Sequence, residues 1–235
     1  MGDAVTEPAE PIGRPPAAAI ELFGDRLPIA VDFVELLARE GERRGLIGPR
    51  EVPRLWERHV LNSAVMAELV PQGARLIDVG SGAGFPGVPL AIARPDLRMT
   101  LLDPMERRTT WLTEVVSKLG LDVSVMRGRA EEPTVRRSVT GVDVASARAV
   151  APLAKLARWC LPLLRPGGLL LALKGASAAE ELDRDADAVR ASGGTDLSVV
   201  TCGAELLAVP TTVVVIRKES SARSRDGRRR TGKDH

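Results

Sequence analysis

Residue types that define several common classes of small protein are scarce in this chain of 235 residues. It contains two cysteines, Cys160 and Cys202, and two histidines, His59 and His235. Two cysteines cannot build a disulfide framework, and so few soft ligands provide no basis for a structural zinc site. We therefore expect a protein without disulfides and without a bound metal.

Aromatic residues and long apolar runs are also lacking. There is no tyrosine, and phenylalanine and tryptophan occur three times each, so an extensive platform for stacking bases is not expected. No stretch approaches the roughly 18 consecutive apolar residues that span a membrane. The segment from Met1 to Pro16 lacks the basic-then-apolar pattern of a signal peptide. These absences predict a cytoplasmic protein with no membrane partner.

Charge is nearly balanced over the whole chain, with a formal net charge of +2, but it is unevenly distributed. The segment from Arg217 to His235 is strongly basic, which leaves the rest of the chain slightly acidic. Arg228, Arg229 and Arg230 in this tail can neutralise phosphates without a fixed fold, so they are candidate RNA-binding residues. A solubilising tail explains the same residues equally well.

Amino-acid composition and apolar periodicity divide the chain into four parts. Residues 1–18 are rich in proline, lack apolar periodicity and are expected to be disordered. Residues 19–72 are expected to form a small N-terminal helical extension, with one or two helices over 20–44 broken near Pro28 and an amphipathic helix over 52–70. Residues 73–218 are expected to form one domain, and 219–235 a basic disordered tail.

Within the domain, apolar runs alternate with helical patterns. Strands are expected over residues 75–79, 99–102, 123–126, 142–146, 169–173, 197–201 and 211–216, and helices over 88–93, 107–119, 152–164 and 178–191. This alternation predicts an α/β fold with a mostly parallel, seven-stranded sheet wrapped by helices. The last two strands are joined only by a loop, so they predict a C-terminal hairpin and an antiparallel edge strand. The layout resembles the Rossmann-like class I methyltransferase fold.

A glycine-rich loop follows the first expected strand and contains Asp78, Gly80, Gly82, Gly84 and Gly87. Glycines let the backbone turn sharply and approach a ligand, which in such folds lies over the carboxyl ends of the strands. The glycines from Gly82 onwards also match the GxGxxG pattern of dinucleotide-binding proteins. Asp78, however, would repel an anionic pyrophosphate, whereas it can accept a hydrogen bond from a methionyl amine or organise the loop. We therefore favour S-adenosyl-L-methionine over a nicotinamide or flavin cofactor.

Two further positions are candidate cofactor contacts. Asp103 ends the second expected strand, where it can bind a ribose diol or cap the following helix. Ala130 and Glu131 follow the third strand, where an adenine ring would lie. Glu131 is otherwise explained as a solvated surface acid.

A specific family resemblance emerges from these segments and their neighbours. The runs Trp56–Ser63, Leu76–Pro95, Thr100–Asp103, Ser146–Ala149 and Leu173–Gly175 resemble the RsmG family, also called glucose-inhibited division protein B. Asn62 departs from the acid that is common there. The resemblance implies transfer of a methyl group from S-adenosyl-L-methionine to guanine N7 in the decoding-region loop of 16S rRNA, with the rRNA or the small ribosomal subunit as partner. It places cofactor contacts on Gly80, Phe85, Ala130, Glu131 and Arg148; we expect a monomer.

The chemistry of the remaining residues is compatible with this acceptor. Guanine N7 has an outward lone pair and no proton, so its methylation needs positioning rather than a general base. Methylation of an exocyclic amine typically uses a Pro-Pro-aromatic loop after the fourth strand, where this chain has Ser146-Ala-Arg-Ala-Val150. Methylation of a pyrimidine carbon needs a nucleophilic cysteine, and both Cys160 and Cys202 are expected to be inert core thiols.

Four polar side chains are candidates for handling the acceptor. Arg148 and Lys174 end the fourth and fifth strands, where they can position the acceptor, although either can instead pair with a nearby acid. Arg58 and His59, which are expected on the polar side of the helix over 52–70, are candidate RNA contacts, although a lone histidine is more often structural. The alternatives are a small-molecule methyltransferase, a non-catalytic RNA-binding assembly factor that holds the cofactor, and an NAD-dependent oxidoreductase.

Overall fold

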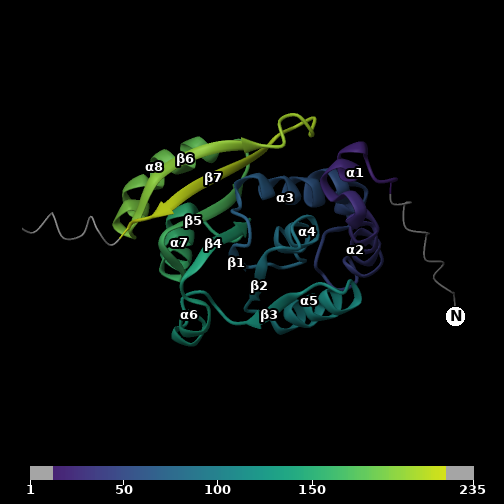
Figure 1. Cartoon of the computed structure of the whole chain (residues 1–235), viewed down its shortest axis with the longest axis horizontal. Coiled ribbons are helices and arrows are strands. Elements are labelled where there is room, and N and C mark those ends of the chain that lie inside the picture. Colours follow the sequence, from purple (N-terminus) through teal and green to yellow (C-terminus); the bar gives the residue numbers. More distant parts are fainter. Residues whose placement is uncertain (1–12, 221–235) are drawn as a thin grey trace, which may run out of the picture.

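The computed structural model describes residues 13–220 (Figure 1). The disorder expected for residues 1–12, the basic tail beyond Ser220, and the candidate RNA contacts Arg228, Arg229 and Arg230 therefore lie outside the described residues.

Two helices begin the described chain. Helix α1 (Ala17–Phe23) starts within the segment 1–18 that we expected to be disordered, so this boundary moves two residues towards the N-terminus. Gly24, with a φ of 50°, ends it, and a short 3-10 turn, η1 (Gly24–Arg26), leads into α2 (Leu27–Glu40). The predicted break is confirmed, but Gly24 makes it, while Pro28 lies in the first turn of α2, where proline is well tolerated.

The predicted helix over residues 52–70 is helical as far as Leu69 but irregular. It consists of the 3-10 segment η2 (Pro49–Arg54), the π-helical segment η3 (Leu55–Leu61), one α-turn, α3 (Asn62–Ala64), and the 3-10 segment η4 (Val65–Leu69). Pro53 lies inside η2, where it cannot donate a backbone hydrogen bond. Because π-helical segments often occur at functional sites, η3 is a candidate part of the functional site.

The sheet contains seven strands in the order β3-β2-β1-β4-β5-β7-β6. They are β1 (Arg75–Val79), β2 (Arg98–Asp103), β3 (Val123–Arg127), β4 (Val142–Arg148), β5 (Leu164–Lys174), β6 (Gly194–Cys202) and β7 (Thr211–Lys218). The expected parallel pairs and the antiparallel hairpin β6–β7 are confirmed.

The expected antiparallel edge strand is confirmed, and the pairing of β7 decides which of the last two strands it is. β7 pairs antiparallel with both β5 and β6, so the edge strand is β6. The reason is hydrophobic burial: Val213, Val214 and Ile216 of β7 are fully buried, whereas β6 exposes much of its length to solvent. The more apolar of the two strands takes the interior place, which the presence of a hairpin alone does not determine.

Helices cover both faces of the sheet (Figure 1). One face packs against the N-terminal helices, α4 (Gly87–Ala93) and α5 (Glu106–Lys118); the other packs against α6 (Pro133–Val139), α7 (Leu153–Cys160) and α8 (Ala178–Ala191). Leu76 and Ile77 of β1 point into the two different cores, as alternation along a strand requires. The N-terminal helices share their core with the sheet, and α6 is a helix that the sequence pattern did not reveal.

The position of the candidate site follows from the point in the sheet where the order of successive strands reverses. β1 lies between β2 and β4; the helix after β1, α4, packs on one face and the helix after β4, α7, packs on the other. The loops that follow β1 and β4 therefore diverge and leave a crevice at the carboxyl ends of the strands. Within residues 13–220, no helix is long and apolar enough to cross a membrane.

Candidate cofactor and acceptor sites

Asp78 is the organising residue of the glycine-rich loop. Its carboxylate is fully buried, accepts a hydrogen bond from Gly87 N at 3.1 Å through Oδ2, and accepts another from Ser146 Oγ at 2.8 Å through Oδ1. Burial raises the pKa of Asp78 to about 6 against the opposing effect of these hydrogen bonds. Of the two roles expected for it, the geometry supports organising the loop.

This arrangement also bears on the choice of cofactor. A dinucleotide pyrophosphate would use the free N–H groups that begin the helix after the loop. Here the carboxylate of Asp78 already occupies Gly87 N at the start of α4, and Pro86 and Pro89 contribute no N–H. The loop therefore fits a cofactor without phosphates.

A pocket of about 460 Å³ lies over the loop. It is lined by Leu46, Ile47, Gly48, Glu51, His59, Gly80, Ser81, Gly82, Ala83, Phe85, Asp103, Pro104, Arg108, Arg148, Ala149 and Val150. Gly80 has a φ of +76°, and a Cβ there would lie 2.6 Å from a methyl carbon of Val150, so this position requires glycine on two counts. The pocket brings together the loop after β1, the end of β2 and the end of β4.

Asp103 lines this pocket, but the expected cap on the following helix is contradicted, because α5 begins at Glu106 and its N-cap residue is Met105. Its Oδ1 accepts from Met105 N at 2.9 Å, and its Oδ2 accepts from Gly82 N at 3.0 Å. Arg108 Nη1 lies 3.5 Å from the same Oδ2. Asp103 thus ties the glycine-rich loop to the segment that leads into α5, and its contact with a ribose diol stays a prediction.

The other candidate cofactor residues do not line this pocket. Gly84 does not line the pocket; a Cβ there would meet Val88 and Phe33, so this glycine permits close packing. Ala130 is buried and Glu131 is exposed, and neither lines the pocket. Their loop begins beside it, because Gly128 N donates to Asp103 O at 3.2 Å. An adenine contact at Ala130 and Glu131 stays a prediction.

Arg148 lies at the end of β4, and its guanidinium is held by an aromatic cluster. Its Cζ is 5.3 Å from the centroid of the Phe85 ring, and its Nη2 is in hydrogen-bond contact with His59 Nδ1. His59 stacks on Phe85 with 5.2 Å between ring centroids, and its Nε2 contacts Glu51. Burial, and then the charge of Arg58, lower the pKa of Arg148 to about 10. His59, expected on the polar side of its helix, is instead mostly buried in the wall of this pocket, with a side chain that is 12% exposed.

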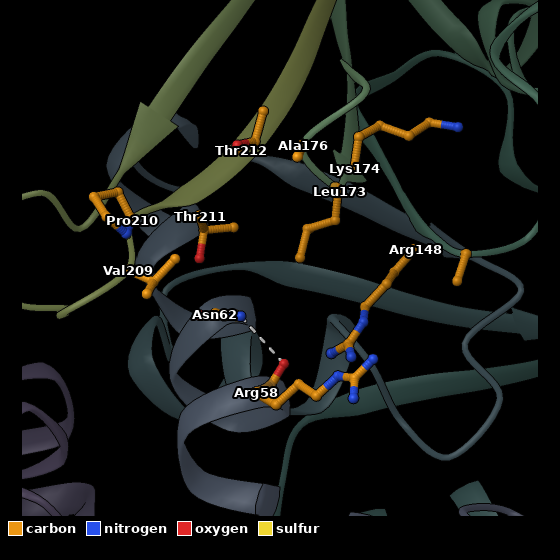
Figure 2. Close-up of a pocket in the computed structure, with 12 residues that line it drawn as sticks. Arg58, Asn62, Arg148, Leu173, Lys174, Ala176, Val209, Pro210, Thr211 and Thr212 are labelled. Atoms are coloured by element: carbon orange, nitrogen blue, oxygen red, sulfur yellow. Dashed lines mark hydrogen bonds between the residues drawn. The ribbon is translucent and has the colours of Figure 1, made fainter. Parts of the chain in front are cut away.

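A second pocket, of about 490 Å³, meets the first at Arg148 and Ala149, which line both. Figure 2 shows it, with lining residues from four segments: Arg58 and Asn62, Arg148 and Ala149, Leu173–Ala176, and Val209–Thr212. The guanidinium groups of Arg58 and Arg148 converge in this view. Among the described residues that line this pocket, none carries a carboxylate or an imidazole.

Lys174 lines the second pocket but directs its ammonium group elsewhere. Its Nζ lies 2.9 Å from Glu181 Oε1 and donates to Ala151 O at 3.2 Å, and in Figure 2 it extends away from Arg58 and Arg148. The alternative that we allowed for this residue, pairing with a nearby acid, is what the geometry supports.

Sequence patterns missed several lining residues. Arg108 could have been predicted from the sequence, because it lies in the first turns of the helix that follows Asp103. Glu51 and Val209–Thr212 gave no signal, since they reach the pockets only through the packing of η2 and through the loop between β6 and β7. No group of metal ligands occurs among residues 13–220.

The cysteines are placed for structure and not for nucleophilic attack. Cys160 is buried, and burial raises its pKa to about 12; Cys202 is also buried, with its pKa raised to about 11. Neither lines the two pockets. The expectation of inert core thiols is confirmed.

The protein is an S-adenosylmethionine-dependent methyltransferase of the Rossmann-like class. Its sheet order and a pocket over the loop after β1 that fits a cofactor without phosphates are typical of this class. Solved structures share the fold. Aeropyrum pernix fibrillarin with natively bound S-adenosyl-L-methionine matches with a TM-score of 0.50 at 21% identity, covering 68% of this chain and 74% of that one. The CurJ carbon methyltransferase matches with a TM-score of 0.52 at 16% identity, covering 86% and 69%.

Sequence comparison defines the family. Residues 26–209 match the model of the GidB family, described as rRNA small subunit methyltransferase G. The ribosomal RNA small subunit methyltransferase G of Corynebacterium jeikeium (strain K411) is 57% identical over 205 residues, which cover 87% of this chain and 92% of that protein. That of Rhodococcus jostii (strain RHA1) is 54% identical over 222 residues, covering 92% and 98%. The chain belongs to the rRNA small subunit methyltransferase G family.

Proposed function

We propose that this protein transfers a methyl group from S-adenosyl-L-methionine to N7 of a guanine in the decoding-region loop of 16S rRNA. The observation that carries the proposal is the convergence of Arg58 and Arg148 in the pocket that adjoins the cofactor pocket. Arg58 Nη1 lies 3.3 Å from Glu51 Oε1, whereas Arg148 has no carboxylate ion-pair partner among the described residues. The pocket therefore keeps a surplus of positive charge, which suits an acceptor that bears phosphates.

The residues of the cofactor pocket fit the proposed donor. Gly80 and Gly82 bring the backbone close to the ligand, and Asp103 is placed for the ribose hydroxyls. The bound cofactor supplies an electrophilic methyl group on a sulfonium. Arg148 and Ala149, which line both pockets, mark where the acceptor atom reaches it.

The acceptor pocket favours an atom that needs no deprotonation. A hydroxyl or amine acceptor loses a proton during transfer and is helped by a general base. Guanine N7 has no proton to lose, and the described lining of the acceptor pocket offers neither carboxylate nor imidazole. Catalysis then rests on orientation: Arg148 and Arg58 hold the nucleotide, and the hydrophobic side chain of Leu173 faces the same space (Figure 2).

The partner we propose is the rRNA itself or the small ribosomal subunit, with the protein acting as a monomer in the cytoplasm. The basic tail would add affinity by binding phosphates. Arg228, Arg229 and Arg230 belong to this part of the proposal.

The test is transfer of a labelled methyl group to small subunits and to deproteinised 16S rRNA, both from cells that lack the enzyme. Mass spectrometry should find a single 7-methylguanosine, and the better acceptor identifies the true partner. Transfer to another base or to another atom of guanine would overturn the proposed reaction. Binding of both the cofactor and the rRNA without any transfer would favour a non-catalytic assembly factor.

A further inference from the structure

We propose that His59 and Glu51 are positioning residues that fix the guanidinium of Arg148 for methyl transfer, through a neutral imidazole that carries its proton on Nε2. The inference deepens the proposed function, because it concerns the residue at the junction of its two pockets. Neither residue needs to touch the acceptor for this role.

The hydrogen-bonding partners determine the protonation state of the ring. Arginine has donors only, so His59 Nδ1, which contacts Arg148 Nη2, must be an unprotonated acceptor. A neutral imidazole then has its N–H on the other nitrogen, and His59 Nε2 lies 2.5 Å from Glu51 Oε2, a carboxylate oxygen that only accepts. The result is a hydrogen-bonded chain of three side chains, Glu51, His59 and Arg148, in which the donor and the acceptor of each hydrogen bond are fixed.

The surroundings hold this chain in one orientation. The ring of His59 stacks on Phe85 at an interplanar angle of 27°, and the Arg148 guanidinium lies over the same ring. The side chain of His59 is 12% exposed, and that of Glu51 is 24% exposed. Ser63 Oγ donates to the backbone oxygen of His59 at 2.6 Å, and this hydrogen bond fixes the backbone of the π-helical segment η3 at His59.

Protonation of His59 would break the arrangement. It would place an N–H opposite the guanidinium of Arg148 and replace a hydrogen bond with repulsion between two cations. The charged groups that face His59 are Glu51 from η2, Arg148 from β4, Arg58 from η3 itself, and Asp103 and Arg108 across the cofactor pocket.

Burial and the charge of Arg148 lower the pKa of His59, and they act against the hydrogen bond that His59 donates to Glu51, which raises this pKa. The ring is therefore neutral near neutral pH and gains a proton as the pH falls. We expect kcat/KM for methyl transfer to fall on the acid side as His59 titrates.

The first experiment observes the imidazole directly. The chain has two histidines, so a His235→Gln variant leaves His59 as the one imidazole in a long-range proton–nitrogen spectrum of the cofactor-free protein. We expect the Nε2–H form at neutral pH. In Arg148→Ala the pKa of His59 should rise, because the facing cation is lost. The Nδ1–H form, or a pKa that does not respond to Arg148→Ala, would overturn the proposal.

The second experiment measures the pH profile of transfer. His59→Asn places an amide oxygen near the position of Nδ1 but does not titrate, so it should retain part of the activity and lose the acid limb. His59→Leu should lose about 10- to 100-fold in kcat/KM, the usual effect of removing a hydrogen bond to a charged group. An acid limb unchanged in His59→Asn would refute the positioning role.

Two glutamate variants form a matched pair. Glu51→Gln removes the charge that holds His59 Nε2–H, and it should lower the pKa of His59 and shift the acid limb towards lower pH together with a reduced kcat. Glu57→Gln, at an exposed glutamate of the segment η3 that carries His59, is the control and should keep the wild-type profile. Equal profiles for both variants would contradict the role of Glu51.

Failure of this inference and failure of the proposed function are distinguishable. If the wild-type protein transfers no methyl group to rRNA, the proposed function fails, while the imidazole spectra still test the chain from Glu51 to Arg148. If transfer is normal and the spectra show the other tautomer, the positioning role alone is wrong.

Discussion

The two pockets that meet at Arg148 are built in different ways. The cofactor pocket is formed by the loop after β1, by the ends of β2 and β4 and by Leu46–Gly48, Glu51 and His59, and its loop is held by the carboxylates of Asp78 and Asp103, which accept hydrogen bonds from backbone N–H groups. The acceptor pocket is formed by side chains from four segments that are far apart in the sequence, and none of these lining residues carries a carboxylate.

This difference separates binding of the donor from choice of the acceptor. A loop locked by its own buried carboxylates presents the same backbone to the cofactor whatever the substrate is. Side chains on the rim can be exchanged without rebuilding the sheet, so specificity can reside there. Arg148 belongs to both pockets, and we expect the largest effects at this position.

Arg148→Ala should abolish measurable transfer to rRNA while the fold survives. The side chain packs on Phe85 and His59, and in the proposed reaction it positions the acceptor. Misplacement of reacting groups costs on the order of 100-fold or more in rate. Transfer kinetics and circular dichroism measure the two properties. Lys174→Ala is the matched control at the end of the neighbouring strand: its partner is Glu181, so the expected loss is mainly about 1 kcal/mol in stability. Similar kinetic losses in both variants would erase the distinction between the two strand ends.

Gly87→Ala should destabilise the cofactor-free protein more than Gly82→Ala. A Cβ at Gly87 would lie 2.2 Å from Leu101 Cδ2 and 2.8 Å from Asp78 Oδ2, so the loop must move, at a cost of about 1 to 3 kcal/mol. At Gly82 the nearest protein atom is 3.8 Å away, and the cost of a positive φ is about 1 kcal/mol. Denaturant unfolding of the two cofactor-free variants compares them. The reverse order of unfolding free energies would show that the loop is not locked from its buried side.

Asp78→Asn tests the buried carboxylate through the pH dependence of stability. In the folded protein the pKa of Asp78 is raised to about 6 from an ordinary value of 3.8, so the native state binds the proton more tightly than the unfolded chain. This group therefore makes the wild-type protein less stable as the pH rises from about 4 to about 6, by at most about 3 kcal/mol.

Denaturant unfolding at several pH values measures this difference. The variant lacks the titrating group, so its deficit in unfolding free energy relative to wild type should shrink across that window. A constant deficit would mean that Asp78 titrates normally and that the loop is not organised around a desolvated acid.

The same comparison explains what the sequence could predict. The cofactor loop was recognisable because its glycines, Asp78 and Asp103 follow strands at fixed positions, and the fold follows from the alternation of strands and helices. His59 was misplaced because its amphipathic pattern assumes a regular helix, whereas residues 55–61 are π-helical, which changes the direction of each side chain.

The acceptor pocket was only partly predictable for a related reason. Arg148 and Lys174 occupy equivalent strand ends, and only the position of Glu181 on α8 shows that Lys174 is engaged elsewhere. Likewise, Val209–Thr212 reach the pocket because β7 inserts between β5 and β6, an order that the hairpin pattern leaves open. Contacts between distant segments are the information that the local sequence pattern does not contain.

Truncation after Ser220 should give the smallest effect, and it sharpens the division between donor and acceptor sites. It removes Arg228, Arg229 and Arg230 and leaves every residue of the two pockets in place. We expect weaker rRNA binding and a shallower dependence of log Kd on log salt concentration, by nearly one unit of slope for each phosphate that the tail neutralises in the full chain. The affinity for S-adenosyl-L-methionine should not change. A salt dependence identical to that of the full chain would show that the tail binds no phosphates and that recognition rests on Arg58, Arg148 and their neighbours alone.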